Sequence, residues 1–258
     1  MYREALEAVS SAAISKARFC QSRLAAFLLH SAMAGAYVGL GILLIFLVGA
    51  PLYAAKSPVT SLVMGATFGI ALSLVLMAGS DLFTSSTMVM PVGAFTRYVS
   101  WGQVLRVLAV TYVGNFLGSL LVAWLAQQSG LFAAAPALTF VQTMAAKKMH
   151  LPFWTAFVRG VLCNWLVVLA AWSYYRLKSE SGKLIMIFWC LLAFIASGFE
   201  HSVANMTLLT LANLLPHGPE ISWAAVGSNL VPVTLGNIVS GAMFMGLAYW
   251  YVSPVWKE

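Results

Sequence analysis

The chain has 258 residues, of which 61% are hydrophobic and only 8% are charged. A soluble domain carries about 25% charged residues, so this composition excludes an ordinary water-exposed surface and indicates an integral membrane protein. The formal net charge of +7 does not indicate a nucleic acid partner, because the basic residues lie at the edges of apolar segments and form no patch interleaved with aromatic residues.

The first 23 residues are amphipathic and of mixed charge. They lack the compact apolar region and the small-residue cleavage site of a secretory signal. We therefore predict a single transmembrane domain over 1–258 that begins with an amphipathic segment at 1–23.

Apolar stretches long enough to cross a bilayer recur six times. About 20 residues of helix span a hydrocarbon core of roughly 30 Å. The uncharged or nearly uncharged stretches cover 24–50, 61–80, 107–128, 151–175, 184–199 with 202–215, and 221–252. The sequence therefore predicts an all-α membrane protein with six transmembrane helices.

The basic residues are distributed unequally between the two sides of this arrangement. One side collects Arg3, Lys16, Arg18, Arg23, Arg97, Arg106, Arg176, Lys178, Lys183 and Lys257. The other side carries Lys56, Lys147 and Lys148. The positive-inside rule therefore predicts that both termini are cytoplasmic.

Polar residues interrupt the second and fifth spans. The second breaks at 79–87, which contains Gly79, Asp81 and five hydroxyl side chains, and the fifth breaks at 197–202. Non-helical backbone at membrane depth is tolerated only where protein or water satisfies its polar groups, so both breaks should line a shared internal path. Surface loops between shorter helices are the alternative, which the flanking apolar segments disfavour.

The two halves of the chain share a weak repeat. Asn115 in the third span matches Asn237 in the sixth, each preceded by Gly, and the segment ending at Asp81 matches the one ending at Glu200. Three crossings per half imply two inverted repeats, with broken second and fifth helices and a substrate site between the repeats.

Half-helix N-termini carry partial positive charge, so broken helices that point towards the midplane favour anions. We expect Asp81 and Glu200 to be structural acids that cap those N-termini and hold the loops. His201 taken alone could be a satisfied core histidine, but its adjacent carboxylate and the matching break in the other half favour a functional role.

A haem group or a metal site is disfavoured. Haem would need paired histidines on facing helices, and His30 and His201, which lie within spans, are not spaced for that. The cysteines Cys20, Cys163 and Cys190 form no CxxC pair, which argues against a zinc site or a disulfide framework. We expect no cofactor and no metal.

The two breaks resemble those of the formate–nitrite transporter family. The resemblance is carried by Asp81-Leu82-Phe83-Thr84 and Gly198-Phe199-Glu200-His201-Ser202, and it extends through 32–41, 65–72, 162–167 and 232–237. Among the subfamilies, the chain is most similar to the bacterial nitrite channels. A formate or hydrosulfide channel of the same family is the alternative.

The resemblance implies a homopentamer in the lipid bilayer of the cell inner membrane, with one aquaporin-like pore per protomer for nitrite or a similar small anion or its conjugate acid. It makes His201 the central histidine, Thr84 the loop threonine and Lys148 the vestibule lysine. Without it, Lys148 reads as a solvated loop cation. The apolar constrictions map to Phe68, Leu72, Leu82, Phe83 and Phe194, and two pore-region positions map to Asn164 and Asn205.

These residues predict a channel mechanism and not an enzyme. A dry constriction opposes a bare anion, whereas a neutral acid escapes most of that desolvation cost. A histidine between constrictions could hydrogen-bond the anion and donate a proton to it, while Lys148 concentrates anions at the entrance. A membrane subunit that only binds a partner would not need symmetric broken helices lined with hydroxyls.

Overall fold

The computed structural model describes residues 2–253, and every regular element among these residues is a helix. The order is α1 (Arg3–Ser22), α2 (Leu24–Ala54), α3 (Thr60–Met77), α4 (Phe83–Phe95), α5 (Trp101–Gln128), α6 (Ala137–Met149), α7 (Phe153–Arg176), α8 (Glu180–Ala196), α9 (Ser202–Leu214), α10 (Trp223–Val239), the π-helix η1 (Ser240–Leu247) and α11 (Ala248–Val252). Lys257, which the sequence groups with the cytoplasmic cations, lies outside the described residues.

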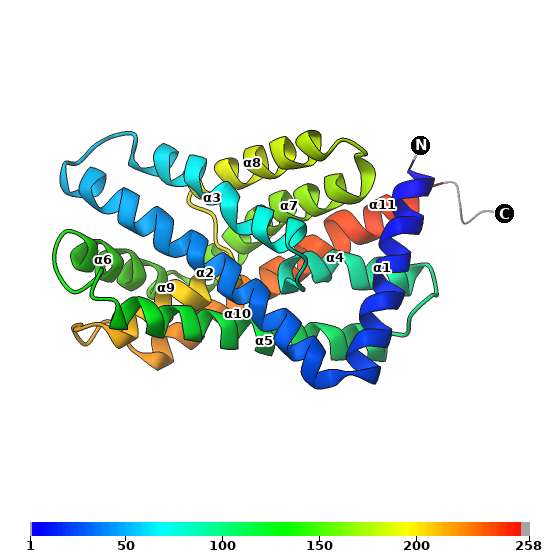
Figure 1. Cartoon of the computed structure of the whole chain (residues 1–258), viewed down its shortest axis with the longest axis horizontal. Coiled ribbons are helices and arrows are strands. Elements are labelled where there is room, and N and C mark those ends of the chain that lie inside the picture. The colour runs from blue at the N-terminus through cyan, green and yellow to red at the C-terminus, as the bar shows by residue number, and fades with distance from the viewer. Residues whose placement is uncertain (1, 254–258) are drawn as a thin grey trace.

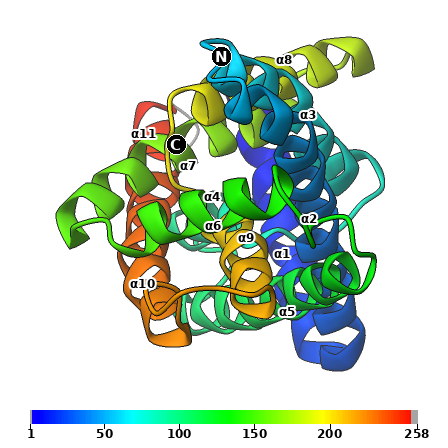
Figure 2. The same cartoon turned by 90° about the vertical axis from the view of Figure 1, so that its left-hand side faces the viewer.

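The long helices run along the longest axis of the molecule, and α1 lies across one end of them (Figure 1). The start of α1 and the end of α11 share this end, where Tyr2 packs edge-on against Tyr249 with ring centroids 5.2 Å apart. Helix α6 lies towards the opposite end, packed against α2, α9 and α10 (Figure 2). Each end of the bundle therefore has one helix that belongs to none of the predicted spans.

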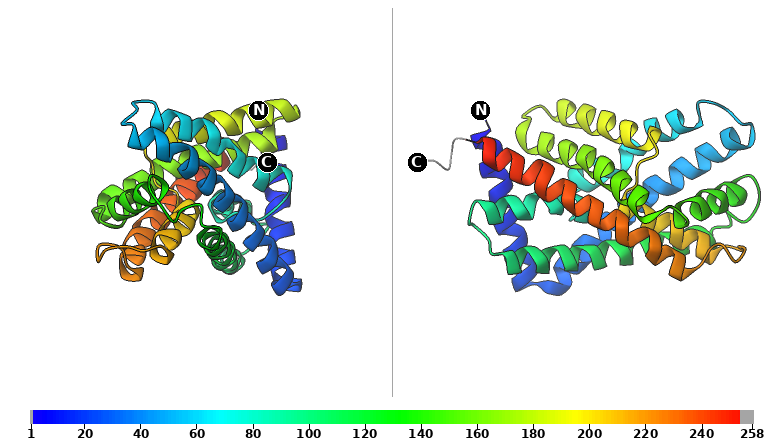
Figure 3. Two further views of the ribbon diagram at one scale, coloured as in Figure 1. Left: turned by 60° about the vertical axis from the view of Figure 1, so that its left-hand side comes forward. Right: turned by 180° about the vertical axis from the view of Figure 1, so that it is seen from behind.

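Five helices in the described part of the chain are long and apolar enough to cross a membrane: Leu24–Ala54, Thr60–Met77, Trp101–Gln128, Phe153–Arg176 and the continuous run Trp223–Val252. The last of these appears from behind as one unbroken rod from α10 to α11 (Figure 3). The predicted fifth span is two shorter helices, α8 with 17 residues and α9 with 13. The break that the sequence predicts there is confirmed, at 197–201.

The other break is shorter than the sequence predicts. It covers 78–82, because α4 begins at Phe83 and takes up the hydroxyl residues expected in the loop. Serine and threonine hydroxyls can bond carbonyls one turn back in their own helix, and Thr87 Oγ1 donates to the Thr84 carbonyl at 2.6 Å. A run of hydroxyl residues is therefore compatible with helix here, and the expectation of a loop through 87 is wrong.

The two short helices that follow the breaks form the centre of the protein. Residues 83–93 of α4 and 202–212 of α9 are all buried. Helix α4 packs against α1, α5 and η1, while α9 packs against α2, α5 and α10. Each half of the chain thus inserts its short helix against elements of the other half, which brings the two breaks together.

Candidate functional site

The loops 78–82 and 197–201 turn in the same way. Each contains a glycine in the left-handed region, Gly79 at φ 76° and Gly198 at φ 71°. Glycine adopts this conformation without the clash that a Cβ brings. The chain can therefore leave α3 or α8 and enter the next helix within five residues.

A buried asparagine on α5 holds the first loop. The Asn115 side-chain oxygen accepts from the Phe83 N–H at 2.8 Å, and its Nδ2 donates to the carbonyls of Ser31 and Asp81 at 2.8 and 2.9 Å. A helix end leaves such backbone groups without partners inside its own helix. Asn115 therefore satisfies the backbone at the first break.

Asn237 on α10 does the same for the second loop. Its side-chain oxygen accepts from the Ser202 N–H at 3.0 Å, and its Nδ2 donates to the carbonyls of Gly160 and Glu200 at 2.8 and 3.2 Å. The sequence pairs Asn115 with Asn237, but neither was predicted as a site residue. Their equivalent positions were the available signal.

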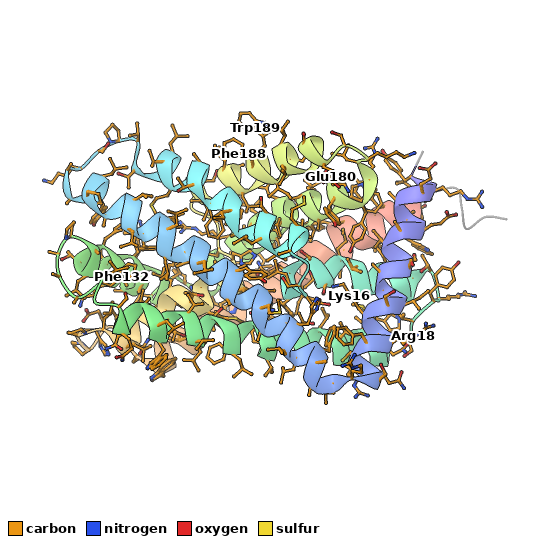
Figure 4. All side chains as sticks on the ribbon, viewed as in Figure 1. Lys16, Arg18, Phe132, Glu180, Phe188 and Trp189 are labelled. Carbon is orange, nitrogen blue, oxygen red and sulfur yellow. The ribbon has the colours of Figure 1, made fainter. Side chains whose placement is uncertain are left out.

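Asp81 is an ion-pair partner and not a helix cap. The carboxylate is 1% exposed, contacts Lys16 Nζ at 2.6 Å and accepts from the Ser86 hydroxyl at 2.7 Å. The residue at the N-terminus of α4 is Leu82, with no capping side chain. The expected capping role of Asp81 is wrong. Lys16 on α1, which sequence reasoning missed, lies on the side of α1 that faces the bundle (Figure 4).

Glu200 has the matching arrangement at the second loop. It is 2% exposed, contacts Lys148 Nζ at 2.7 Å and accepts from Asn205 Nδ2 at 2.6 Å. Asn205 also donates to Asn229 Oδ1 at 2.8 Å. The α9 N-terminus is capped by His201, so the capping role expected for Glu200 is wrong as well. Lys148 lies in the last turn of α6 and is not a free loop cation.

His201 uses both of its ring nitrogens. Nδ1 accepts from the Ala204 N–H at 3.1 Å, and Nε2 lies 3.1 Å from Thr84 Oγ1. Because Nδ1 is an acceptor, the ring is neutral in this arrangement and its proton sits on Nε2, which donates to the Thr84 hydroxyl. The ring is 4% exposed and stacks on Phe194 with centroids 5.8 Å apart.

Asn164 on α7 bonds to both α4 and α10. Its Nδ2 donates to Thr87 Oγ1 at 2.9 Å and to the Asn237 carbonyl at 2.6 Å, with a longer contact to the Thr84 carbonyl at 3.4 Å. The Asn164 Oδ1 atom is buried without a hydrogen-bond partner among the described residues. Asn164 therefore supports the Thr84 backbone, and none of these bonds reaches His201.

A cavity of about 320 Å³ lies beside α6, and we call it the α6-side cavity. Its walls include Ile42, Phe46, Met64, Met144, Lys147, Lys148, Phe194, His201 and Asn205. A second cavity, of about 400 Å³, lies beside α1, and we call it the α1-side cavity. Its walls include Ser15, Lys16, Phe19, His30, Val75, Ser80, Asp81, Tyr174 and Tyr175.

A small apolar gap of about 10 Å³ lies between these cavities. It is enclosed by Val38, Phe68, Ala71, Leu72, Leu82, Val167, Leu191, Phe194 and His201. Helix α3 orders the three spaces, because Met64 lines the α6-side cavity, Phe68 and Leu72 the gap, and Val75 the α1-side cavity. Residues three and four apart share one helix face, so a single face of α3 follows the whole series.

Four of the five expected constriction residues enclose this gap, and Phe83 does not. The Phe83 ring packs edge-on against Tyr112 at 4.9 Å, and its N–H is held by Asn115. Thr84 reaches the gap through its bond to His201. Among residues 2–253, no group of three His, Cys, Asp or Glu side chains is placed to hold a metal ion.

A family model described as "Formate/nitrite transporter" matches residues 3–251. The chain belongs to this family. It is 46% identical over 254 residues to the nitrite transporter NirC of Escherichia coli K12, covering 98% of this chain and 93% of the relative. This formate/nitrite transporter is thus similar to a transporter along nearly its full length.

Two solved structures have the same fold. One, described as an FNT family ion channel, superposes with a TM-score of 0.93 at 45% identity and covers 98% of this chain and 100% of that one. The other, a pentameric formate channel with formate bound, gives a TM-score of 0.78 at 28% identity, covering 88% and 96%. The two cavities and the gap therefore occur in a chain that has the fold of known membrane channels.

Proposed function

We propose that this formate/nitrite transporter conducts nitrite, as the anion or its conjugate acid, through a path within each protomer. The observation that carries the proposal is the series of two cavities, each with charged residues in its wall, separated by an apolar gap with His201 at its edge. Similarity to a nitrite transporter along nearly the whole chain supports nitrite over formate. Formate and hydrosulfide are the competing substrates of the same path.

The membrane arrangement that we propose has six crossings. Helices α3 and α4 together make one crossing and α8 and α9 another, each broken near the middle by its loop. The matching bonds of Asn115 and Asn237 support two inverted repeats. The unequal distribution of basic residues supports cytoplasmic termini in the cell inner membrane, and in this orientation the α1-side cavity faces the cytoplasm. Likeness to a pentameric channel supports a homopentamer.

The apolar gap favours a neutral permeant. An unpaired anion between Phe68, Leu72 and Leu82 loses its hydration without gaining a partner, at a cost of many kcal/mol. The Nε2–H of His201 and the Thr84 hydroxyl are the polar groups at its edge. We propose that they bind the permeant by hydrogen bonds as it enters the gap.

Proton donation by His201 requires a change in its bonding. The neutral ring has only the Nε2 proton, and a second proton must bind at Nδ1, which accepts from the Ala204 N–H. A protonated ring and that N–H are both donors, so the bond that caps α9 must open first. We propose that His201 mainly donates a hydrogen bond, and that it transfers a proton only after this cap is released.

Anion uptake into proteoliposomes tests the proposal, with nitrite, formate, nitrate and chloride compared across pH. His201→Asn keeps a good capping residue and removes the ring, so nitrite uptake should fall at least about tenfold, the effect of losing one strong hydrogen bond. The pentamer should survive, as a cross-linking ladder that ends at five. His150→Asn, at an exposed histidine, is the matched control. Unchanged uptake and pH profile in His201→Asn would defeat the role of His201, and a lack of wild-type nitrite uptake would defeat the proposal itself.

A further inference from the structure

A pocket of about 500 Å³ lies between α1 and α5, and we call it the α1–α5 pocket. Its walls include Ala17 and Gln21 of α1, Gly102, Gln103 and Arg106 of α5, and Ser100, which caps α5. None of these residues lines the α1-side cavity, the apolar gap or the α6-side cavity. The path that we propose for nitrite therefore leaves this pocket unused.

The polar groups that the pocket offers are hydrogen-bond donors. The Ser100 N–H donates to Gln103 Oε1 at 2.8 Å, and the Gln103 N–H donates to the Ser100 hydroxyl oxygen at 3.3 Å. These bonds occupy the acceptor atoms, so the groups left without a partner are the Gln103 side-chain NH₂ and the Ser100 O–H. Among the described residues no carboxylate lines the pocket. The wall therefore suits a ligand that accepts hydrogen bonds and carries negative charge.

Arg106 supplies a positive charge to the pocket wall. Its guanidinium donates a hydrogen bond to the Cys20 sulfur of α1, which is 1% exposed. Burial raises the pKa of the Cys20 thiol, so the sulfur carries no charge that would neutralise the arginine. Arg106 has no carboxylate partner among the described residues. Helix α1 therefore holds the guanidinium in place, while most of its five N–H donors remain available.

Surplus positive charge lies close to the wall along the chain. Arg18, Arg23 and Arg97 are each within three residues of a wall residue. In the part of the chain that the structure describes, none of the three has a carboxylate partner. The two acids of α1 are already paired with other cations. This end of the bundle therefore attracts anionic groups.

The pocket lies at the start of a membrane-spanning helix. Helix α5 is one of the five helices long and apolar enough to cross a membrane, and the wall residues occupy its first turns. Tyr98 and Trp101, which flank Ser100 along the chain, are exposed, and such residues are enriched at membrane–water interfaces. Leu105, one turn further into the span, is 69% exposed. A ligand here therefore meets polar donors and an apolar surface together, as the headgroup and chains of a lipid require.

We infer that the α1–α5 pocket binds the phosphate group of an anionic phospholipid, with Arg106 as the counter-ion and the acyl chains against the exposed apolar surface of α5 that begins at Leu105. Basic pockets beside membrane-spanning helices bind lipid headgroups in this way. Helix α1 lies across one end of the bundle (Figure 1), and its residues form one wall of the pocket. The bound lipid therefore joins α1 to the membrane-spanning bundle.

The test is native mass spectrometry of the purified protein in detergent, with phosphatidylglycerol, phosphatidylcholine or inorganic phosphate added. The wild type should bind phosphatidylglycerol at least about tenfold more tightly than phosphatidylcholine. Arg106→Gln should raise the dissociation constant for phosphatidylglycerol at least about tenfold, because a hydrogen bond between charged groups is lost. Arg18→Gln, which removes an exposed arginine that is not in the wall, is the control and should keep the wild-type affinity.

A second variant fills the pocket and leaves Arg106 unchanged. A Cβ at Gly102 would meet only the Ser100 hydroxyl oxygen, at 3.8 Å, so Gly102→Leu fits the helix and should also weaken phosphatidylglycerol binding at least about tenfold. Gly227→Leu, at an exposed glycine of α10 with open space around it, should have no effect. Wild-type affinity in both Arg106→Gln and Gly102→Leu, or an equal loss in Arg18→Gln, overturns the inference. Displacement of the lipid by an equal concentration of inorganic phosphate would also overturn it, in favour of a soluble anion. These outcomes do not depend on nitrite transport.

Discussion

The loops 78–82 and 197–201 share a framework but differ at the residue that enters the next helix. Both have a left-handed glycine, a buried acid paired with a lysine, and an asparagine bonded to three backbone groups. At the helix entrance the first loop has Leu82 and the second has His201. The same framework therefore occurs twice because each break leaves the same kind of backbone groups to be bonded. The loops differ in the side chain before the next helix, which is the apolar Leu82 in the first loop and the polar His201 in the second.

Replacement of either asparagine should cause the largest loss of stability, and it tests whether the two loops are held in the same way. Asn115→Leu and Asn237→Leu each leave one N–H and one loop carbonyl buried without a partner, at about 1–3 kcal/mol per group, and remove a second bond to a carbonyl inside a neighbouring helix. We expect each to lower the free energy of unfolding by about 2–6 kcal/mol, and by similar amounts. Thermal unfolding of the purified protein in detergent measures the loss.

Asn213→Leu is the matched control for the asparagines. Asn213 donates one bond to the Leu209 carbonyl of its own helix and is only half-buried, so about 1 kcal/mol or less should be lost. A full loss at one loop and none at the other would show that the two breaks are held by different means.

The acids give the next largest effect. Asp81→Asn and Glu200→Gln each leave a lysine that is about a fifth exposed without its counter-charge. Breaking a buried pair costs about 3–5 kcal/mol, and residual contact with water reduces this to about 2–4 kcal/mol. We expect a lower yield of folded protein and unchanged selectivity between nitrite and chloride, measured by size-exclusion chromatography and uptake.

Glu4→Gln tests whether that loss is specific, because the Glu4–Lys178 pair is 3.8 Å long and almost fully exposed. It should have no measurable effect. Normal folding of Asp81→Asn or Glu200→Gln with altered ion preference would mean that these acids face the permeating ion and do not hold the loops.

The exposed cation of the α6-side cavity gives the smallest effect. Lys148→Ala would leave the buried Glu200 carboxylate without its ion-pair partner, so Lys147→Gln is the cleaner test of electrostatic attraction. We expect uptake to fall about two- to threefold at low nitrite and not at saturation. The difference should vanish near 1 M salt, where the Debye length is about 3 Å. Lys178→Gln is the control, and a loss that persists at high salt contradicts attraction at a distance.

The sequence predicted the features that depend on local pattern. Apolar runs located the five helices of the described residues that are long enough to cross a membrane, and polar residues located both breaks, with Gly198 and His201 inside the second as expected. The hydroxyl run after Leu82 led to a wrong predicted end for the first break, because an intrahelical bond such as that of Thr87 cannot be recognised from composition. Helix α6 was missed for a related reason, since its amphipathic sequence is too short and too polar for a span.

Contacts between distant segments were beyond sequence reasoning. The Lys16–Asp81 pair joins a surface helix to a buried loop, and nothing in the letters around Lys16 distinguishes it from Arg18 or Arg23. The sequence therefore predicted backbone N–H groups as the partners of Asp81 and Glu200, whereas their partners are lysines. The Asn115 and Asn237 positions were recognised as equivalent, but their role needed the coordinates.

The distribution of polar bonds along the chain has a consequence for biogenesis. The bonds of Asn115 and the Lys16–Asp81 pair lie within the first 115 residues, and those of Asn237 towards Gly160, Glu200 and Ser202 lie within the second half. The bonds from His201 to Thr84 and from Asn164 to Thr87 cross between halves. A ribosome-bound first half can therefore complete its own framework before the rest is synthesised, whereas the contact at His201 forms only when the second half has docked. The His201–Thr84 contact is then made later than the framework of the first loop.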